Sequence, residues 1–120
     1  MSGRTMSVKI YHNPRCSKSR QTLQLLQQQG ITPEIIEYLK TPPSVQELDD
    51  ILQKLDMEPR KLMRKNEAAY KANGLDDASL DRQALITAMV AYPILIERPL
   101  VVAHGKAALG RPPEAVLTIL

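Results

Sequence analysis

The sequence predicts an α/β fold, a mixed sheet with flanking helices, and two observations support this class. A β-branched segment at Val8–His12 is followed by a helical pattern and then by an apolar segment at Glu34–Leu39. A strand, a helix and a strand within about 30 residues form a right-handed βαβ unit. Near the C-terminus, Leu100–His104 and Ala107–Leu109 have the pattern of a hairpin.

The first three elements are separated by residues that interrupt regular structure. Asn13-Pro14 ends the first strand, because proline has no N–H to donate to a sheet. The helix is expected to begin at Ser17 and to stop at Gly30, a residue typical of helix C-termini. Residues Met1–Thr5 are expected to form an unstructured lead-in.

The middle of the chain predicts several helices. After Pro42-Pro43, Ser44 lies three residues before Glu47, which is the spacing of a capping box. Apolar residues then follow at helical spacing as far as Leu55. Three further helical segments are expected, a short basic helix at Pro59–Lys65, a turn at Glu67–Lys71, and a helix that Asp81 caps and that ends before Pro93.

The last elements complete one domain. The hairpin turn is expected at Gly105-Lys106, and Pro112 and Pro113 suit the first turn of a helix that runs to Leu120. A βαβ half and a ββα half that share one sheet resemble the thioredoxin arrangement. The expectation is a single domain over residues 1–120, with a helical insertion at about 44–92.

Composition and charge exclude several classes of protein. The chain is 43% hydrophobic and 24% charged, as ordinary globular proteins are. A net charge of +3 is too small to indicate nucleic acid, although it suits a small anionic ligand. No apolar run approaches the ~20 residues of a membrane span. The sequence therefore predicts a cytoplasmic protein without a nucleic-acid or membrane partner, and a monomer, since no long apolar face is left unassigned.

Cys16 is the main candidate for chemistry. It lies between a strand and a helix, where free backbone N–H groups stabilise a thiolate and bind anions. Its neighbours add hydroxyl groups and positive charge. His12, at the end of the strand, is expected either to lower the pKa of the thiol as an imidazolium or to orient the loop. The alternative is a buried structural cysteine.

A single cysteine limits the chemistry. Ser19 occupies the position at which a CxxC motif has its second cysteine, so any disulfide must form with an external thiol. With one cysteine and two distant histidines, the sequence predicts no metal site.

Several basic residues have two interpretations. A cis-proline at Pro99 would place Arg98 toward the cysteine loop, whereas the alternative is a turn proline beside a surface arginine. Arg111 is either a ligand-binding residue or a surface residue at a helix start. The basic cluster of Arg60, Lys61, Arg64 and Lys65 is either a nucleic-acid contact, which lacks stacking aromatic residues nearby, or a solvated helix face.

Four motifs occur in order along the chain: HNPRCSKSR at His12–Arg20, MRKNE around Arg64, PILIERPLVV around Arg98, and GRPPE around Arg111. Together they resemble the motifs of the glutaredoxin-coupled arsenate reductase (ArsC-like) family from about Val8 to Leu120. The resemblance is nearest to the YfgD branch of that family, and it implies a thioredoxin-like fold with a helical insertion.

The resemblance also implies roles for individual residues. Cys16 matches the catalytic nucleophile, His12 a histidine that helps to activate the thiol, and Ser19 a serine that contacts the cysteine. The three arginines that hold the oxyanion correspond to Arg64, Arg98 and Arg111, and the family's cis-proline corresponds to Pro99.

The activity that the resemblance implies is reduction of arsenate to arsenite. The partners are arsenate or a similar oxyanion, glutathione as co-substrate, and glutaredoxin, and no cofactor is bound. Two alternatives stay open. One is a regulatory binding protein like Spx, which contacts RNA polymerase. The other is a thiol transferase that acts on glutathione mixed disulfides.

Overall fold

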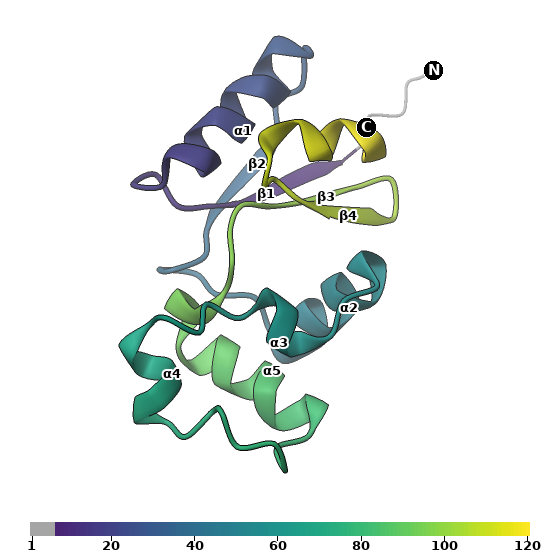
Figure 1. Ribbon diagram of the computed structural model, residues 1–120. Helices are drawn as coiled ribbons and strands as arrows, with labels where there is room; N and C mark the ends of the chain where they lie inside the picture. The colour runs from purple at the N-terminus through teal and green to yellow at the C-terminus, as the bar shows by residue number, and fades with distance from the viewer. Residues whose placement is uncertain (1–6) are drawn as a thin grey trace. The chain divides into compact units, whose positions relative to one another are not determined.

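The computed structural model describes residues 7–120, so the expected lead-in Met1–Thr5 lies outside it. The described chain divides into two compact units (Figure 1). Residues 7–38 and 98–120 form the first unit, and residues 39–97 form the second. The helices expected at about 44–92 lie in the second unit. No helix in the described part is long and apolar enough to cross a membrane.

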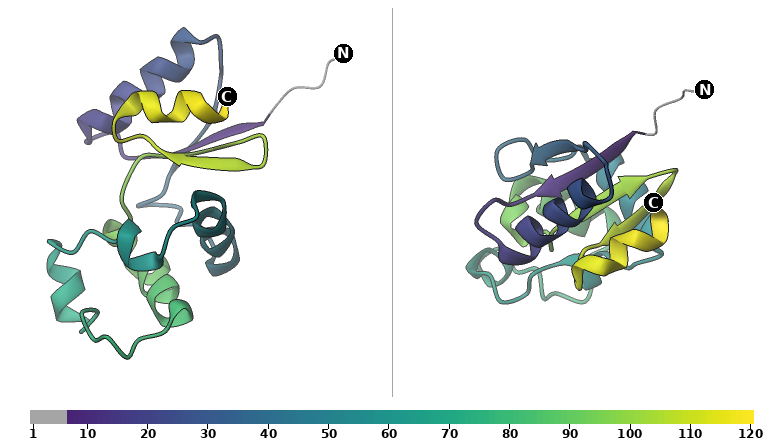
Figure 2. Two further views of the ribbon diagram at one scale, coloured as in Figure 1. Left: turned by 45° about the vertical axis from the view of Figure 1, so that its right-hand side comes forward. Right: turned by 90° about the horizontal axis from the view of Figure 1, so that it is seen from above.

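The first unit contains a four-stranded mixed sheet in the order β2-β1-β3-β4 (Figures 1 and 2). β1 is parallel to β2 and antiparallel to β3, and β4 pairs antiparallel with β3. The predicted βαβ unit, C-terminal hairpin and mixed sheet are therefore confirmed. The elements are β1 (Val8–His12), α1 (Ser17–Gln28), β2 (Glu34–Glu37), β3 (Leu100–Ala103), β4 (Lys106–Leu109) and the 3₁₀ helix η2 (Pro113–Ile119).

Both helical elements of the first unit, α1 and η2, lie side by side on one face of the sheet (Figure 2). Alternate residues of β1 and β3 point into the core beneath them, as the two-residue repeat of a strand requires. Val8, Ile10, Val101 and Ala103 come from the strands, and Leu26 and Val116 come from the two helices. Burial of these apolar side chains stabilises the unit and holds α1 on the sheet.

Two predicted elements of this unit differ in detail. β2 ends at Glu37 rather than Leu39, because its last partner on β1 is His12 and β1 stops there. The hairpin turn is His104-Gly105 rather than Gly105-Lys106. Both turn residues have positive φ, 55° and 72°, a conformation that matches the twist of a two-residue hairpin.

The second unit contains α2 (Val45–Leu55), α3 (Pro59–Leu62), α4 (Ala68–Ala72), α5 (Arg82–Ala91) and the 3₁₀ helix η1 (Pro93–Leu95). The predicted capping box is present, since Ser44 and Glu47 exchange hydrogen bonds of 3.0 and 2.8 Å. Asp81 caps α5 by accepting from the Ala84 N–H at 2.8 Å. Helices α2 and α3 pack against α5, and α4 packs against η1.

The basic helix is shorter than the sequence predicts. α3 ends at Leu62 rather than Lys65, because Met63 is extended and forms an antiparallel bridge with Ile96. The N–H of Arg64 then donates to the carbonyl of Leu95 at 2.7 Å. Pairing with a distant segment therefore takes the backbone groups that would have continued the helix.

Candidate functional site

A tight turn places Cys16 at the start of α1. The N–H of Cys16 donates to the carbonyl of Asn13 at 3.0 Å, and Pro14 occupies the second position, where proline's fixed φ suits a turn. The side chain of Asn13 accepts from the N–H of Arg15 at 3.0 Å. Cys16 then adopts extended backbone angles as the N-cap residue of α1.

Cys16 is buried, with 8% of its surface exposed. Burial by itself raises the pKa of the Cys16 thiol. The backbone N–H groups of Ser19 and Lys18 and the guanidinium of Arg98 outweigh burial, and the net pKa of the thiol is lowered. A lowered pKa increases the thiolate fraction at neutral pH, and the thiolate is the nucleophilic form. These surroundings favour a reactive cysteine over a structural one.

Ser19 and His12 support the loop from beneath. Ser19 is fully buried and His12 is 6% exposed. The Oγ atom of Ser19 accepts from the N–H of Asn13 at 3.0 Å and lies 2.6 Å from Nδ1 of His12. These contacts connect the end of β1 to the first turn of α1.

Of the two roles expected for His12, the structure favours loop orientation. Burial lowers the pKa of His12 more than the carboxylate of Glu37 raises it, and Arg20 lowers it further. A lowered pKa favours the neutral imidazole over the imidazolium in this environment. This agrees with loop orientation, and activation of the thiol by His12 stays a prediction.

Arg98 and Arg111 are brought together by the hairpin. The pairing of Leu100 with Leu109 places the residues before β3 and after β4 at one end of the sheet. Nη1 of Arg111 donates to the carbonyl of Arg98 at 3.3 Å. The Arg98–Pro99 peptide bond is cis, as the resemblance implies, and the Arg111–Pro112 bond is cis as well.

Arg64 lies in the second unit, in a different environment. Its Nη1 is 2.7 Å from the carboxylate of Glu67, and its Nε is 3.7 Å from the carboxylate of Glu97. Both acidic residues belong to the same unit as Arg64. The role of Arg64 toward an oxyanion stays a prediction.

Arg60, in the predicted solvated cluster, has a structural role instead. Its guanidinium donates to the hydroxyl of Tyr70 at 2.9 Å and to the carbonyls of Leu75 and Asp77. These bonds hold the segment after α4 against α3. The sequence does not reveal this role, because the two carbonyls lie 15 and 17 residues further along the chain than Arg60.

Gly110 is a residue that sequence reasoning missed, although it stands in the GRPPE motif. A Cβ atom at this position would lie 2.6 Å from Oγ1 of Thr22 and 2.8 Å from Cγ of Pro99. The N–H of Gly110 also donates to the carbonyl of Pro99 at 2.9 Å. Glycine here allows β4, α1 and the cis-proline to approach one another.

The chemical groups at the start of α1 and at the end of the hairpin favour negative charge. Within residues 7–120, no group of three or more His, Cys, Asp or Glu side chains is placed to hold a metal ion. The first unit instead combines a helix N-terminus, the Cys16 thiol and the two arginines of the hairpin. Guanidinium groups bind oxyanions with paired donors and stay charged at all physiological pH values.

The chain is similar to known proteins over nearly its whole length. The model of the ArsC family matches residues 11–119. The uncharacterized protein YfgD of Escherichia coli (strain K12) is 56% identical over 117 residues, which are 97% of this chain and 98% of YfgD. An arsenate reductase of Neisseria meningitidis serogroup A is 50% identical over 94% of this chain and 97% of its own length.

The fold is also similar to that of a solved structure. The arsenate reductase of Vibrio cholerae has a TM-score of 0.93 and 55% sequence identity, and the match covers 98% of this chain and all of that one. Together with the mixed sheet and its flanking helices, this similarity confirms the thioredoxin-like α/β class.

Proposed function

The chain belongs to the ArsC family, and from that premise we propose that it reduces arsenate to arsenite through a Cys16 thiolate, with glutathione and glutaredoxin as the external thiols. The observation that carries the proposal is the lowered pKa of a cysteine at the start of α1, beside Arg98. A thiol with such surroundings can attack an oxyanion that the same positive charges attract.

Binding of the oxyanion is assigned to arginines. Arg98 and Arg111 come together at the end of the hairpin, and the family resemblance adds Arg64. Their charges neutralise the oxygens of arsenate, while the helix N–H groups near Cys16 favour the negative charge on sulfur. The same field thus serves both reactants.

The chemical steps balance with two external thiols. The Cys16 thiolate attacks arsenic, a sulfur–arsenic bond forms, and one oxygen leaves as water after taking a proton. A glutathione thiolate then attacks the Cys16 sulfur, so that a disulfide forms and the sulfur–arsenic bond breaks. Its electron pair remains on arsenic, which leaves as arsenite. A glutaredoxin thiolate removes the glutathione from Cys16 and restores the thiolate.

Each turnover moves two electrons from sulfur to arsenic. Cys16 is the only cysteine in the 120-residue sequence, so the second thiol must come from another molecule. This requirement agrees with the use of glutathione and glutaredoxin in the proposal.

The test is NADPH oxidation coupled through glutathione reductase, in the presence of arsenate, glutathione and glutaredoxin. We expect arsenate-dependent turnover with the wild-type chain and none above background with Cys16→Ser. The Cys16→Ser protein serves as the matched blank, since it changes one atom at the reacting centre. Absence of turnover by folded wild-type protein with a reduced Cys16 would overturn the proposal.

A second candidate, thiol transfer from glutathione mixed disulfides, is favoured by the same low-pKa thiol without a partner cysteine. It predicts turnover of a small glutathione mixed disulfide in the absence of arsenate. Comparing the two substrates in one coupled assay distinguishes the candidates, because each predicts activity that depends on its own substrate.

A further inference from the structure

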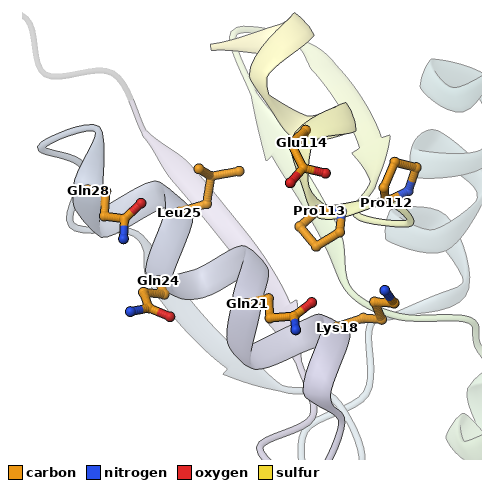
Figure 3. A pocket seen from close by; sticks show the side chains of 8 residues that line it. All are labelled: Lys18, Gln21, Gln24, Leu25, Gln28, Pro112, Pro113 and Glu114. Atoms are coloured by element: carbon orange, nitrogen blue, oxygen red, sulfur yellow. The ribbon is translucent and has the colours of Figure 1, made fainter.

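A groove of about 390 Å³ lies between α1 and η2, entirely within the first unit (Figure 3). Lys18, Gln21, Gln24 and Gln28 line one wall, and Pro113 and Glu114 belong to the other. The four residues from α1 recur at steps of three and four, the spacing that brings side chains onto one face of a helix. The groove therefore follows the axis of α1.

The groove begins where the proposed reaction takes place. Lys18 comes two residues after Cys16, and its backbone N–H helps to lower the pKa of the thiol. On the opposite wall, Pro112 also lines the groove and directly follows Arg111. Each wall thus starts within two residues of a group assigned to the reaction.

The dimensions suit a short peptide. At 1.5 Å per residue, the α1 stripe from Lys18 to Gln28 is about 15 Å long. An extended tripeptide spans roughly 10 Å. The volume lies within the range of small-molecule sites in proteins, about 300 to 1,000 Å³.

The charges in the groove are opposite in sign and are available to a ligand. Lys18 supplies an ammonium from α1, and Glu114 supplies a carboxylate from η2 (Figure 3). Within residues 7–120, neither charged group forms an ion pair or a side-chain hydrogen bond. The glutamines that follow Lys18 along α1 present amide groups that both donate and accept (Figure 3). A zwitterionic peptide matches this set.

We propose that this groove is the subsite for glutathione, an inference that rests on the proposed function and places its co-substrate. Glutathione carries two carboxylates, one ammonium, two amide bonds and a central thiol. The ammonium belongs to the γ-glutamyl end, so this end lies toward Glu114. A glycyl carboxylate in that position would be repelled by Glu114.

The same orientation satisfies the other end. The glycyl carboxylate pairs with Lys18 at the mouth of the groove, and the cysteinyl sulfur lies toward Cys16. The glutamine amides bond to the γ-glutamyl amide and α-carboxylate. Specificity for the γ-glutamyl arm follows from charge, since among the residues lining the groove only Glu114 is acidic.

The experiment uses S-methylglutathione, which cannot react, in a chemical-shift titration of the full ¹⁵N-labelled chain. We expect saturable shifts along 18–28 and 112–114. Lys18→Gln and Glu114→Gln should each weaken the Kd by about three- to fivefold, the size of one exposed charge pair. Lys106→Gln and Glu34→Gln are matched controls on the exposed surface of β4 and β2, and they should leave the Kd unchanged.

Truncated ligands test the orientation. γ-Glutamyl-S-methylcysteine should still depend on Glu114, whereas S-methylcysteinylglycine should bind equally to wild type and Glu114→Gln. Shifts confined to other parts of the chain, no saturable shift, or groove variants that bind like wild type would each overturn the inference.

The titration is independent of arsenate turnover, so the two proposals can fail separately. Binding of S-methylglutathione in the groove without arsenate turnover would overturn the proposed function and support the subsite. Arsenate turnover by a chain whose groove residues show no chemical-shift change with S-methylglutathione would overturn the subsite alone. If both hold, Glu114→Gln should raise the KM for glutathione by the same factor and leave the KM for arsenate unchanged.

Discussion

Arg98 and Arg64 both stand in motifs that resemble those of the ArsC family, but the two units surround them with groups of different charge. In the first unit, the guanidinium of Arg98 acts on the Cys16 thiol and lowers its pKa. In the second unit, the guanidinium of Arg64 faces the carboxylates of Glu67 and Glu97. The charge of Arg98 is thus directed at a reacting group, whereas that of Arg64 is partly neutralised by its own unit. The residue type alone does not tell how much positive charge is available for an anion.

The largest expected effect comes from removing the charge beside the thiol. In Arg98→Ala, we expect the pKa of Cys16 to rise and kcat/KM for arsenate to fall by about 10²-fold, the usual effect of losing one transition-state donor. Iodoacetamide alkylation as a function of pH reports the pKa, and the coupled assay reports turnover.

Arg98→Lys is the control for this prediction. It keeps the charge, so the pKa of Cys16 should stay low, but a point charge cannot reproduce the planar fork that binds two oxygens. Full recovery of turnover in Arg98→Lys would contradict a paired-donor role for Arg98.

The next effect concerns stability of the first unit. Gly110→Ala places a Cβ against Thr22 and Pro99, and overpacking of this kind costs about 1–3 kcal/mol in the free energy of unfolding. Urea denaturation measures the loss. Adding Thr22→Ala removes one of the two obstructing side chains and should recover part of the stability. An unchanged urea midpoint in Gly110→Ala would show that the hairpin shifts without loss of unfolding free energy.

A smaller effect tests the neutralised arginine. Glu67→Gln removes one of the two carboxylates near Arg64 and should lower the KM for arsenate, by up to about fivefold for one partly exposed ion pair. The alkylation profile of Cys16 should not change. A higher KM in Glu67→Gln would mean that Glu67 positions Arg64 instead of competing with the oxyanion.

The smallest effect is a pH dependence from His12. Its pKa in the folded chain is lowered by burial, so below about pH 6.5 the unfolded chain binds a proton that the folded chain does not. The stabilisation is present above that pH and is lost as the pH falls toward the folded pKa. Urea denaturation at several pH values between 5 and 7.5 gives the free energy of unfolding. This free energy should depend less steeply on pH in His12→Gln than in the wild-type chain. Equal slopes would place the titration of His12 at its ordinary pKa.

Much of the chain follows from local sequence. β1, the capping box at Ser44, the Asp81 cap and the glycine-terminated α1 depend on neighbouring residues, and each occurs where the sequence predicts it. The position of Cys16 between a strand and a helix follows in the same way. These features depend on interactions between residues a few positions apart, so a local sequence pattern is enough to predict them.

Other features depend on residues far apart in the chain. β2 stops at Glu37 because its partner strand ends, and α3 stops at Leu62 because Met63 pairs with Ile96. The lowered pKa of His12, the anchoring of Arg60 and the need for glycine at 110 all arise from burial or close approach. Only the tertiary structure decides such properties, because desolvation and contact distance are set by segments that meet only after folding.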